Sequence, residues 1–398
     1  MSGLFRDSFP FFKENPDSIY FDSASTSQKL KTSIDAMSDF YSKSCSNIGR
    51  ASYRLSNAAG MRVEEVRSRA AEYIGCEASD VIFTKSATES SNLVCRSFLP
   101  VVLHEGDNVL TSSLEHNSAF LPLKTASERA GAHLRVISPG KDDGIDPDEF
   151  EKSIDSNTKA AVFTCASNVS STKIDYTELC RICREKGVIS ILDATQLLAH
   201  KRINVKSLGC DFLFFSAHKM YSLSGCGILY AKREHIDAME PLLYGGGIVE
   251  TLSPLSIVSG NRKFEAGSPD VGSIIAFGAA LDFLFENQDA IPETERKLCK
   301  KLREGFEDLK DKCRLIGKAD SEIPVASFTV PGISDYDITS YLGASDISVR
   351  SGRMCAHTLF DALGIDGCIR VSLGCYNTEE EISRFFDCLN RILKKFSV

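Results

Sequence analysis

The segment between about residue 80 and residue 230 alternates short runs of β-forming residues with stretches of helical pattern. The β runs cover residues 81–84, 108–111, 134–137, 160–164, 188–192, 212–215 and 227–230. Helical patterns lie between them over residues 88–99, from 117, from 146 and over 176–186. Buried strands that alternate with helices are typical of a mostly parallel sheet covered by helices on both faces. The pattern therefore predicts an α/β fold.

The chain of 398 residues is long enough for two or three domains at about 150 residues each. Its texture changes near residue 286, where a charged helical stretch over residues 294–312 leads into short strands near 325–330 and 346–349. A last helix is expected from Thr378. We predict a large domain over residues 15–285 and a smaller C-terminal α/β domain over residues 286–398, joined by residues 1–14.

Composition and charge argue against several classes of protein. No apolar run approaches the roughly 18 residues of a membrane span, so no membrane association is expected. The N-terminal segment is charged and lacks an apolar signal core, which predicts a cytoplasmic protein. A net charge of −8 gives nucleic-acid phosphates little to bind, so no nucleic-acid partner is expected. The 14 cysteines should accordingly be reduced, and most of them should be buried.

Polar residues follow several of the predicted strands, at the edge where ligands of parallel sheets gather. They are Thr88, His116, Asp193, Ser216, His218 and Lys219. Amides and hydroxyl groups at a helix start form a phosphate cradle, and a lysine in a dry cleft beside an aspartate is a nucleophile toward carbonyls. Taken singly, each residue has an ordinary structural explanation, such as a helix cap or a solvated amine. Taken together they suggest an anionic cofactor with a carbonyl and a ring nitrogen, which describes pyridoxal 5'-phosphate.

Four motifs resemble those of class V, fold-type I pyridoxal-phosphate enzymes. They are Asp193-Ala194-Thr195-Gln196, Ser216-Ala217-His218-Lys219, Phe264-Glu265-Ala266-Gly267-Ser268-Pro269 and Arg350-Ser351-Gly352-Arg353-Met354-Cys355-Ala356. The last two are similar to the group II, SUF-type cysteine desulfurases, which share selenocysteine lyase activity. The resemblance extends from about Ile19 to the C-terminus. It implies the fold-type I transferase fold, conversion of L-cysteine to L-alanine, and transfer of sulfur to an acceptor protein or iron–sulfur scaffold.

The resemblance also implies a role for individual residues. Lys219 matches the lysine that binds the cofactor covalently, Cys355 the thiol that becomes a persulfide, and His116 the imidazole stacked on the ring. Asp193 matches the acid at the pyridine nitrogen and Gln196 the amide near the phenolic oxygen. The remaining matches are Thr88, Ser216 and His218 at the phosphate, Ser268 at the phosphate of the neighbouring subunit in a homodimer, and Asn168 and Arg370 near the substrate.

Some positions depart from the family pattern, and several questions stay open. Gly49 and Tyr53, on either side of Arg50, replace histidines at the expected substrate entrance. Arg353 and Met354 stand beside Cys355 where the family often has histidine. The sulfur acceptor and the choice between cysteine and selenocysteine are therefore undecided. Another class V reaction (amino transfer, epimerisation or kynureninase-like hydrolysis) and a catalytically silent scaffold remain alternatives.

Two arginines and one cysteine pair complete the expectations. Arg350 and Arg353 lie close to Cys355 in sequence, and positive charge favours a thiolate. Cys180 and Cys183 form a CxxC pattern inside the expected helix over residues 176–186. Structural zinc needs four ligands, so this pair is expected to pack in the core, and no metal site is predicted.

Overall fold

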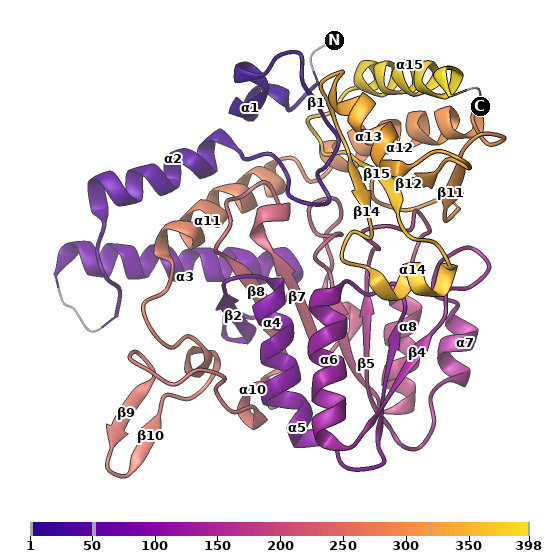
Figure 1. Cartoon of the computed structure of the whole chain (residues 1–398). Helices are drawn as coiled ribbons and strands as arrows, with labels where there is room; N and C mark the ends of the chain where they lie inside the picture. The colour runs from indigo at the N-terminus through magenta and orange to yellow at the C-terminus, as the bar shows by residue number, and fades with distance from the viewer. Residues whose placement is uncertain (1–2, 50–52, 319, 397–398) are drawn as a thin grey trace.

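A computed structural model of the chain describes residues 3–49, 53–318 and 320–396 (Figure 1). Arg50, at the expected substrate entrance, lies outside the described residues. A seven-stranded sheet and a four-stranded sheet organise the described part, accompanied by two smaller pairs of strands.

The large sheet has the strand order β2–β8–β7–β6–β5–β3–β4. Neighbouring strands from β4 to β7 are parallel, and β8 is antiparallel to both β2 and β7. Their bounds are β2 Val81–Thr84, β3 Asn108–Ser112, β4 His133–Ile137, β5 Thr158–Thr164, β6 Ile189–Asp193, β7 Phe212–Ser216 and β8 Gly227–Ala231. All seven predicted β runs are confirmed, with shifts of one or two residues at some of their ends.

Helices cover both faces of this sheet, because successive side chains of a strand point to opposite faces. Phe212 and Phe214 pack in a core with α4, α5, α6 and α10, whereas Leu213 and Phe215 pack in a core with α3, α8 and α11. Figure 1 shows α4 and α6 in front of the strands. The bounds are α3 Arg54–Ile74, α4 Ala87–Leu93, α5 Leu99–Val102, α6 Asn117–Ala130, α7 Pro147–Lys152, α8 Tyr176–Lys186, α9 Val205–Leu208, α10 Arg233–Ala238 and α11 Val271–Glu286.

The helix predicted over residues 88–99 differs from the structure. It begins one residue earlier as α4, continues through a π-helical turn over Val94–Phe98, and then becomes the short α5. Pro100 lies in the first turn of α5. Because proline has no N–H to bond the carbonyl four residues before it, the regular α-helical ladder cannot run through this point. The helices α6, α7 and α8 begin where the sequence predicted.

The four-stranded sheet is antiparallel, in the order β11–β12–β15–β14. Its strands are β11 Arg314–Ile316, β12 Val325–Thr329, β14 Arg350–Gly352 and β15 Cys368–Ser372, with helices α12 Ala290–Glu307, α13 Asp335–Gly343, α14 His357–Leu363 and α15 Glu379–Lys395. The strand predicted near 346–349 belongs instead to β13 (Ile347–Ser348), which pairs with β1 (Ile19–Tyr20). Ile19 and Phe21 also lie in the core of this part. The exact domain limits remain a prediction.

Two N-terminal helices and a β-hairpin lie outside the two sheets. Helices α1 (Pro10–Glu14) and α2 (Lys31–Asp39) come from the N-terminal segment, and a hairpin of β9 (Val249–Leu252) and β10 (Leu255–Ile257) projects from the body (Figure 1). Among the described helices, none combines the length and the apolar character that crossing a bilayer requires.

Candidate active site

A cavity of about 190 Å³ lies where β5, β6 and β7 end, and it is lined by residues from both sheets. Most of the predicted site residues line it together: Thr88, His116, Asn168, Asp193, Gln196, Ser216, His218, Lys219, Cys355 and Arg370. Ser268 does not; it is exposed in the loop before α11. The structure therefore gathers around one cavity predicted residues as far apart in sequence as Thr88 and Arg370.

Lys219 enters the cavity from the turn that follows β7. Burial lowers the pKa of its amine to about 8, although the negative charge of Asp193 acts in the opposite direction. An amine with this pKa is partly unprotonated near neutral pH, and the unprotonated form attacks carbonyl groups. Lys219 therefore suits covalent binding of a carbonyl-bearing cofactor.

Asp193 is the last residue of β6 and only 4% exposed. Its Oδ1 accepts a hydrogen bond from the backbone N–H of Thr195 at 2.9 Å, and burial raises the pKa of the carboxyl group. Within the described chain, no cationic side chain forms an ion pair with Asp193. A buried carboxylate in this state needs a cationic partner, and the protonated nitrogen of a pyridine ring is such a partner.

His116 caps the start of α6 and presents a neutral ring to the cavity. Its Nδ1 accepts a hydrogen bond from the Ser118 N–H at 3.1 Å and lies 2.7 Å from the Ser118 hydroxyl. Nδ1 is therefore an acceptor, and the ring proton is on Nε2. Burial and the charge of Lys219 lower the pKa of His116 to about 4. A neutral, fixed imidazole suits stacking on a flat ring.

The predicted phosphate-binding part of the cavity lies at the start of α4, next to Thr88. The backbone N–H of Ala87 donates to the Ser216 hydroxyl at 2.7 Å. Ser216 is paired in register with Gly227 of β8, and a Cβ atom on Gly227 would lie only 2.5 Å from the backbone carbonyl carbon of Ser86. Glycine at this position therefore allows the start of α4 to pack directly against the strand, with its N–H groups beside the cavity.

Gln196 lies in the segment after β6, and the N-terminal segment of the chain fixes its side chain. The amide Nε2 of Gln196 donates to the carbonyl of Ala24 at 3.0 Å. Ala24 and Ser25, which are not among the predicted site residues, also line the cavity. The side-chain oxygen of Gln196 makes no hydrogen bond within the described chain, so the side chain is held with its carbonyl group free.

Arg370 on β15 is 2% exposed, and it joins the two parts of the site. Its Nη2 pairs with Asp22 at 2.8 Å and its Nη1 donates to the carbonyl of Asn168 at 3.1 Å. Nε is buried without a partner in the described chain. A guanidinium group suits a substrate carboxylate, and here each terminal nitrogen already uses one of its two N–H groups within the chain.

Cys355 is exposed and lies in a strained loop. Met354 and Cys355 have φ values of 46° and 56°, which non-glycine residues adopt at a cost. Two hydrogen bonds hold the loop: Asn168 Nδ2 donates to the Met354 carbonyl at 2.7 Å, and the Asn117 N–H donates to the Cys355 carbonyl at 2.7 Å. The loop after β5 and the start of α6 thus hold the segment of the thiol beside the cavity.

The family model described as Aminotransferase class-V matches residues 19–385. The chain belongs to the class-V aminotransferase family. A relative named cysteine desulfurase, from Cronobacter sakazakii, is 34% identical over 381 residues, which cover 94% of this chain and 93% of the relative. The apo structure of cysteine desulfurase from Thermococcus onnurineus NA1 has a TM-score of 0.94 at 32% identity, with 99% of both chains covered. The cysteine desulfurase CsdA from Escherichia coli has a TM-score of 0.89 at 27% identity, with 98% of both chains covered.

These likenesses confirm the predicted resemblance to class-V enzymes and to cysteine desulfurases. They also confirm the predicted fold, a mostly parallel large sheet between helices. The assignment to the SUF-type subgroup and the role of each site residue remain predictions.

The positive charges expected beside Cys355 are partly neutralised in this class-V chain. Arg353 Nη1 pairs with Asp361 at 2.7 Å. Arg350 lies 3.4 Å from Asp22 and also donates to Ser25. Both guanidinium groups therefore already have carboxylate partners, which reduces the net positive charge that they present to the thiol.

Glu115 is a residue near the site that the sequence analysis did not assign. It is fully buried directly before His116; its Oε1 accepts hydrogen bonds from the Ser112 hydroxyl at 2.6 Å and the Thr164 N–H at 3.1 Å. Its Oε2 has no partner in the described chain. Burial raises the pKa of Glu115 to about 8. The feature of the sequence that could have identified Glu115 is its place as a charged residue between a buried strand and a histidine.

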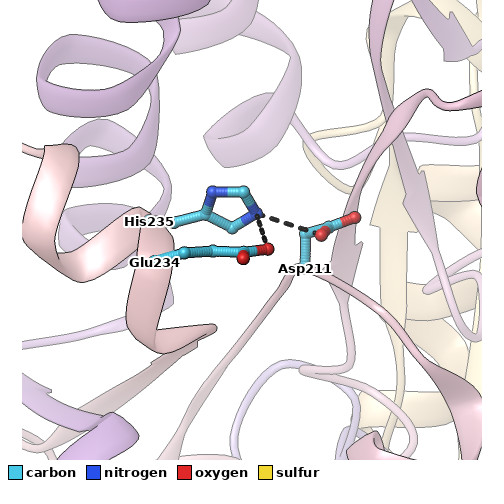
Figure 2. Close-up of side chains that lie close together, drawn as sticks. All are labelled: Asp211, Glu234 and His235. Carbon is cyan, nitrogen blue, oxygen red and sulfur yellow. Dashed lines mark hydrogen bonds and ion pairs between the residues drawn. The ribbon is translucent and has the colours of Figure 1, made fainter.

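A second group of titratable residues lies away from the cavity: Asp211, Glu234 and His235 (Figure 2). His235 Nε2 lies 3.0 Å from Asp211 Oδ1, and the ammonium group of Lys232 donates to the same oxygen at 2.7 Å. Because a lysine already occupies this oxygen, the group is a satisfied ion-pair cluster. The predicted core packing of the CxxC pair is confirmed: Cys180 and Cys183 lie on α8 and are buried in the core.

Proposed function

We propose that this chain is a pyridoxal-phosphate-dependent cysteine desulfurase that converts L-cysteine to L-alanine and leaves a persulfide on Cys355. The observation that carries the proposal is the cavity itself. It brings an exposed thiol to the same space as a lysine with a lowered pKa and a buried aspartate without a cation. The names of the relatives agree with this activity.

The cavity residues divide between the parts of the cofactor. Asp193 would hold the ring nitrogen, His116 would pack on the ring face and Gln196 would bind the phenolic oxygen. Thr88, Ser216 and His218 would bind the phosphate. The unpaired carboxylate of Asp193 and the unoccupied carbonyl of Gln196 support this assignment, because a protonated ring nitrogen and a phenolic group complement them.

Lys219 and Cys355 carry out different steps of the proposed reaction. Bound pyridoxal phosphate supplies an electron sink for the carbon atoms of the substrate. Lys219 takes a proton from the substrate Cα and later returns one, which its lowered pKa favours. The Cys355 thiolate attacks the sulfur of L-cysteine; the S–S bond forms as the Cβ–S bond breaks. The electron pair of the broken bond stays with Cβ, which then takes a proton to give alanine.

Arg370 and Asn168 position the substrate and the thiol. The free Nε of Arg370 offers a charged hydrogen bond to the substrate carboxylate, and burial strengthens such a bond. Asn168 connects Arg370 to the loop of Cys355. Its backbone carbonyl accepts a hydrogen bond from Arg370, and its side-chain amide donates to the backbone carbonyl of Met354. Arg370 is therefore two hydrogen bonds away from the loop of the nucleophile, and a substrate carboxylate that contacts Arg370 is three away.

The assembly and cellular role follow the SUF-type resemblance. We propose a homodimer in which Ser268 reaches the phosphate of the neighbouring subunit, because Ser268 is exposed and does not line its own cavity. Arg67 pairs with Glu265 at 2.7 Å and holds the segment before Ser268 in place. The persulfide is passed to a sulfur-acceptor protein or an iron–sulfur scaffold in the cytoplasm. Selenocysteine is a second substrate to be tested.

A comparison of two exposed cysteines tests the proposal. Cys45 and Cys355 are both exposed thiols, but only Cys355 lines the cavity. After incubation with L-cysteine, mass spectrometry should find one extra sulfur on the Cys355 peptide and none on the Cys45 peptide. Cys355→Ala should lose alanine production, whereas Cys45→Ala should keep it. Equal alanine production by wild type and Cys355→Ala would remove Cys355 from the mechanism, and amino transfer without desulfuration would select another class-V reaction.

A further inference from the structure

The N-terminal segment over residues 26–29 is hydrogen-bonded to the turn that carries Lys219. Two side chains of this segment donate to the carbonyl oxygen of His218, Lys29 Nζ at 2.8 Å and Ser27 Oγ at 3.1 Å, and the hydroxyl oxygen of Thr26 lies 3.2 Å from the same carbonyl oxygen. The N–H of Ser27 also points to this oxygen at 3.3 Å. The backbone carbonyl of His218, directly before Lys219, therefore accepts hydrogen bonds from Lys29 and Ser27, which lie far from it in sequence.

The ring of His218 contacts the same segment. Its Nδ1 lies 3.1 Å from the hydroxyl oxygen of Thr26. That hydroxyl oxygen in turn accepts a hydrogen bond from Lys29 Nζ at 2.8 Å. The other ring nitrogen, Nε2, has no hydrogen-bond partner within the described chain, and His218 lines the cavity.

The single proton of the Thr26 hydroxyl can go to only one of two acceptors, the carbonyl oxygen of His218 or its Nδ1. Lys29 and Ser27 already donate to the carbonyl. Nδ1 of His218 has no other donor in the described chain, so the Thr26 proton is best used there. Nδ1 is then an acceptor, and the neutral ring carries its proton on Nε2. Burial and the charges of Lys219 and Lys29 lower the pKa of His218 to about 4, which keeps the ring neutral.

We propose that Lys29 is a positioning residue that acts through Thr26 to fix the Nε2-protonated tautomer of His218, so that this ring donates a hydrogen bond to the phosphate of the cofactor. The inference rests on the cofactor assignment under Proposed function. Lys29 contributes in two ways: its ammonium group donates to the Thr26 hydroxyl, and it occupies the carbonyl that would otherwise compete for the hydroxyl proton. Without Lys29, the wrong tautomer would turn a lone pair toward the phosphate.

The affinity of the apoprotein for two ligands tests the role directly. Pyridoxal 5'-phosphate carries the phosphate group, and pyridoxal lacks it. Lys29→Met should raise the dissociation constant of pyridoxal 5'-phosphate about tenfold or more, the usual effect of losing a hydrogen bond to a charged group. The dissociation constant of pyridoxal should stay within about twofold of wild type, because no phosphate is present. Both constants are measured by equilibrium dialysis, without an activity assay.

Matched variants separate positioning from general damage. Lys31→Met removes an exposed lysine that pairs with Asp35, and it should change neither constant. Thr26→Val should reproduce the effect of Lys29→Met, and Thr26→Ser, which keeps the hydroxyl, should restore wild-type affinity. In the His218→Ala background, Lys29→Met should add no further loss, because the residue through which it acts is absent.

The outcomes distinguish this inference from the cofactor assignment. Equal losses of affinity for both ligands in Lys29→Met, or a full additional loss in the His218→Ala background, would overturn the role of Lys29 while wild-type binding remained. Failure of the wild-type protein to bind pyridoxal 5'-phosphate more tightly than pyridoxal would overturn the cofactor assignment, and the inference with it. The ¹⁵N shifts of the His218 ring give a second measurement: wild type should show a protonated Nε2, and Lys29→Met a mixture of tautomers.

Discussion

Two buried aspartates lie at opposite ends of the same pair of parallel strands, β6 and β7. Asp193 is the last residue of β6, and Asp211 directly precedes β7. Asp193 accepts a hydrogen bond from the N–H of Thr195 and has no ion pair within the described chain. Asp211 accepts from the N–H and hydroxyl of Ser190, from the ammonium of Lys232 and from the ring of His235.

The pKa values of the two carboxyl groups differ accordingly. Burial raises the pKa of Asp193. Burial acts in the same direction on Asp211, but its hydrogen bonds to His235 and Lys232 outweigh it, and the pKa falls to about 2. One end of the strands therefore contributes a satisfied, stabilising cluster, whereas the other keeps a carboxyl group that has no ion-pair partner within the described chain. A buried carboxyl group of this kind at the carboxyl end of a parallel sheet marks the place where a ligand supplies a partner that the chain does not.

The largest effect is expected for Asp193→Asn. An amide cannot balance the positive charge of a protonated ring nitrogen, so kcat should fall by about 10²–10³-fold, the range for loss of one preorganised electrostatic group. The free energy of unfolding of the apoprotein should not fall, because the replaced carboxylate is buried without an ion pair. Steady-state kinetics and urea unfolding measure the two quantities. Loss of stability with unchanged kcat would reverse the roles of the two aspartates.

The pH dependence of cofactor uptake follows from the lowered pKa of Lys219. Only the unprotonated amine attacks a carbonyl, so the rate at which the apoprotein takes up pyridoxal 5'-phosphate should rise about tenfold per pH unit up to the pKa and then level off. Levelling is expected near pH 8, well below the ordinary lysine value of 10.5. Stopped-flow absorbance measures the rate. Since Asp193 raises the pKa of Lys219, Asp193→Asn should move the levelling point to lower pH, and a rate that still rises above pH 10 would contradict the burial of this amine.

A smaller effect, on stability alone, is expected for Asp211→Asn. The lowering of its pKa from 3.8 to about 2 corresponds to a stabilisation on the order of 2 kcal/mol at neutral pH. Because the folded-state pKa is depressed, this contribution is fully present above the unfolded-state pKa near 4 and is lost as the pH falls toward 2. Urea unfolding should therefore show a destabilised variant at pH 7 whose difference from wild type shrinks in acid. At a temperature at which the variant is folded, kcat should be unchanged. A loss of kcat comparable to that of Asp193→Asn would contradict the assignment of a purely stabilising role to Asp211.

The strands and the strand-end residues could be predicted because they depend on local pattern. Asp193 and Lys219 follow apolar runs, and the carboxyl ends of parallel strands meet at one edge. The contact between Lys29 and the carbonyl of His218 could not be predicted in this way, since it joins residues 189 positions apart and depends on the final packing. The same limit applies to Arg370: its motif suggested substrate binding, but only the fold shows that Asp22 already occupies one of its nitrogens.

The smallest effect is expected at the exposed side of the site, where Arg353 anchors the loop of Cys355. Arg353 pairs with Asp361 at 2.7 Å and donates to the carbonyl of Asp366 at 3.2 Å, but the two paired side chains are 33% and 67% exposed. Solvent screens such a pair, so Arg353→Ala should cost no more than about 1 kcal/mol of unfolding free energy. Its absorbance with bound cofactor should equal that of wild type, because Arg353 does not line the cavity. Only persulfide formation should slow, by about threefold, as the strained loop gains freedom. Asp361→Asn should reproduce this change. A shifted absorbance spectrum of the bound cofactor in either variant would show that the loop of Cys355 affects the cofactor site around Asp193 and Lys219.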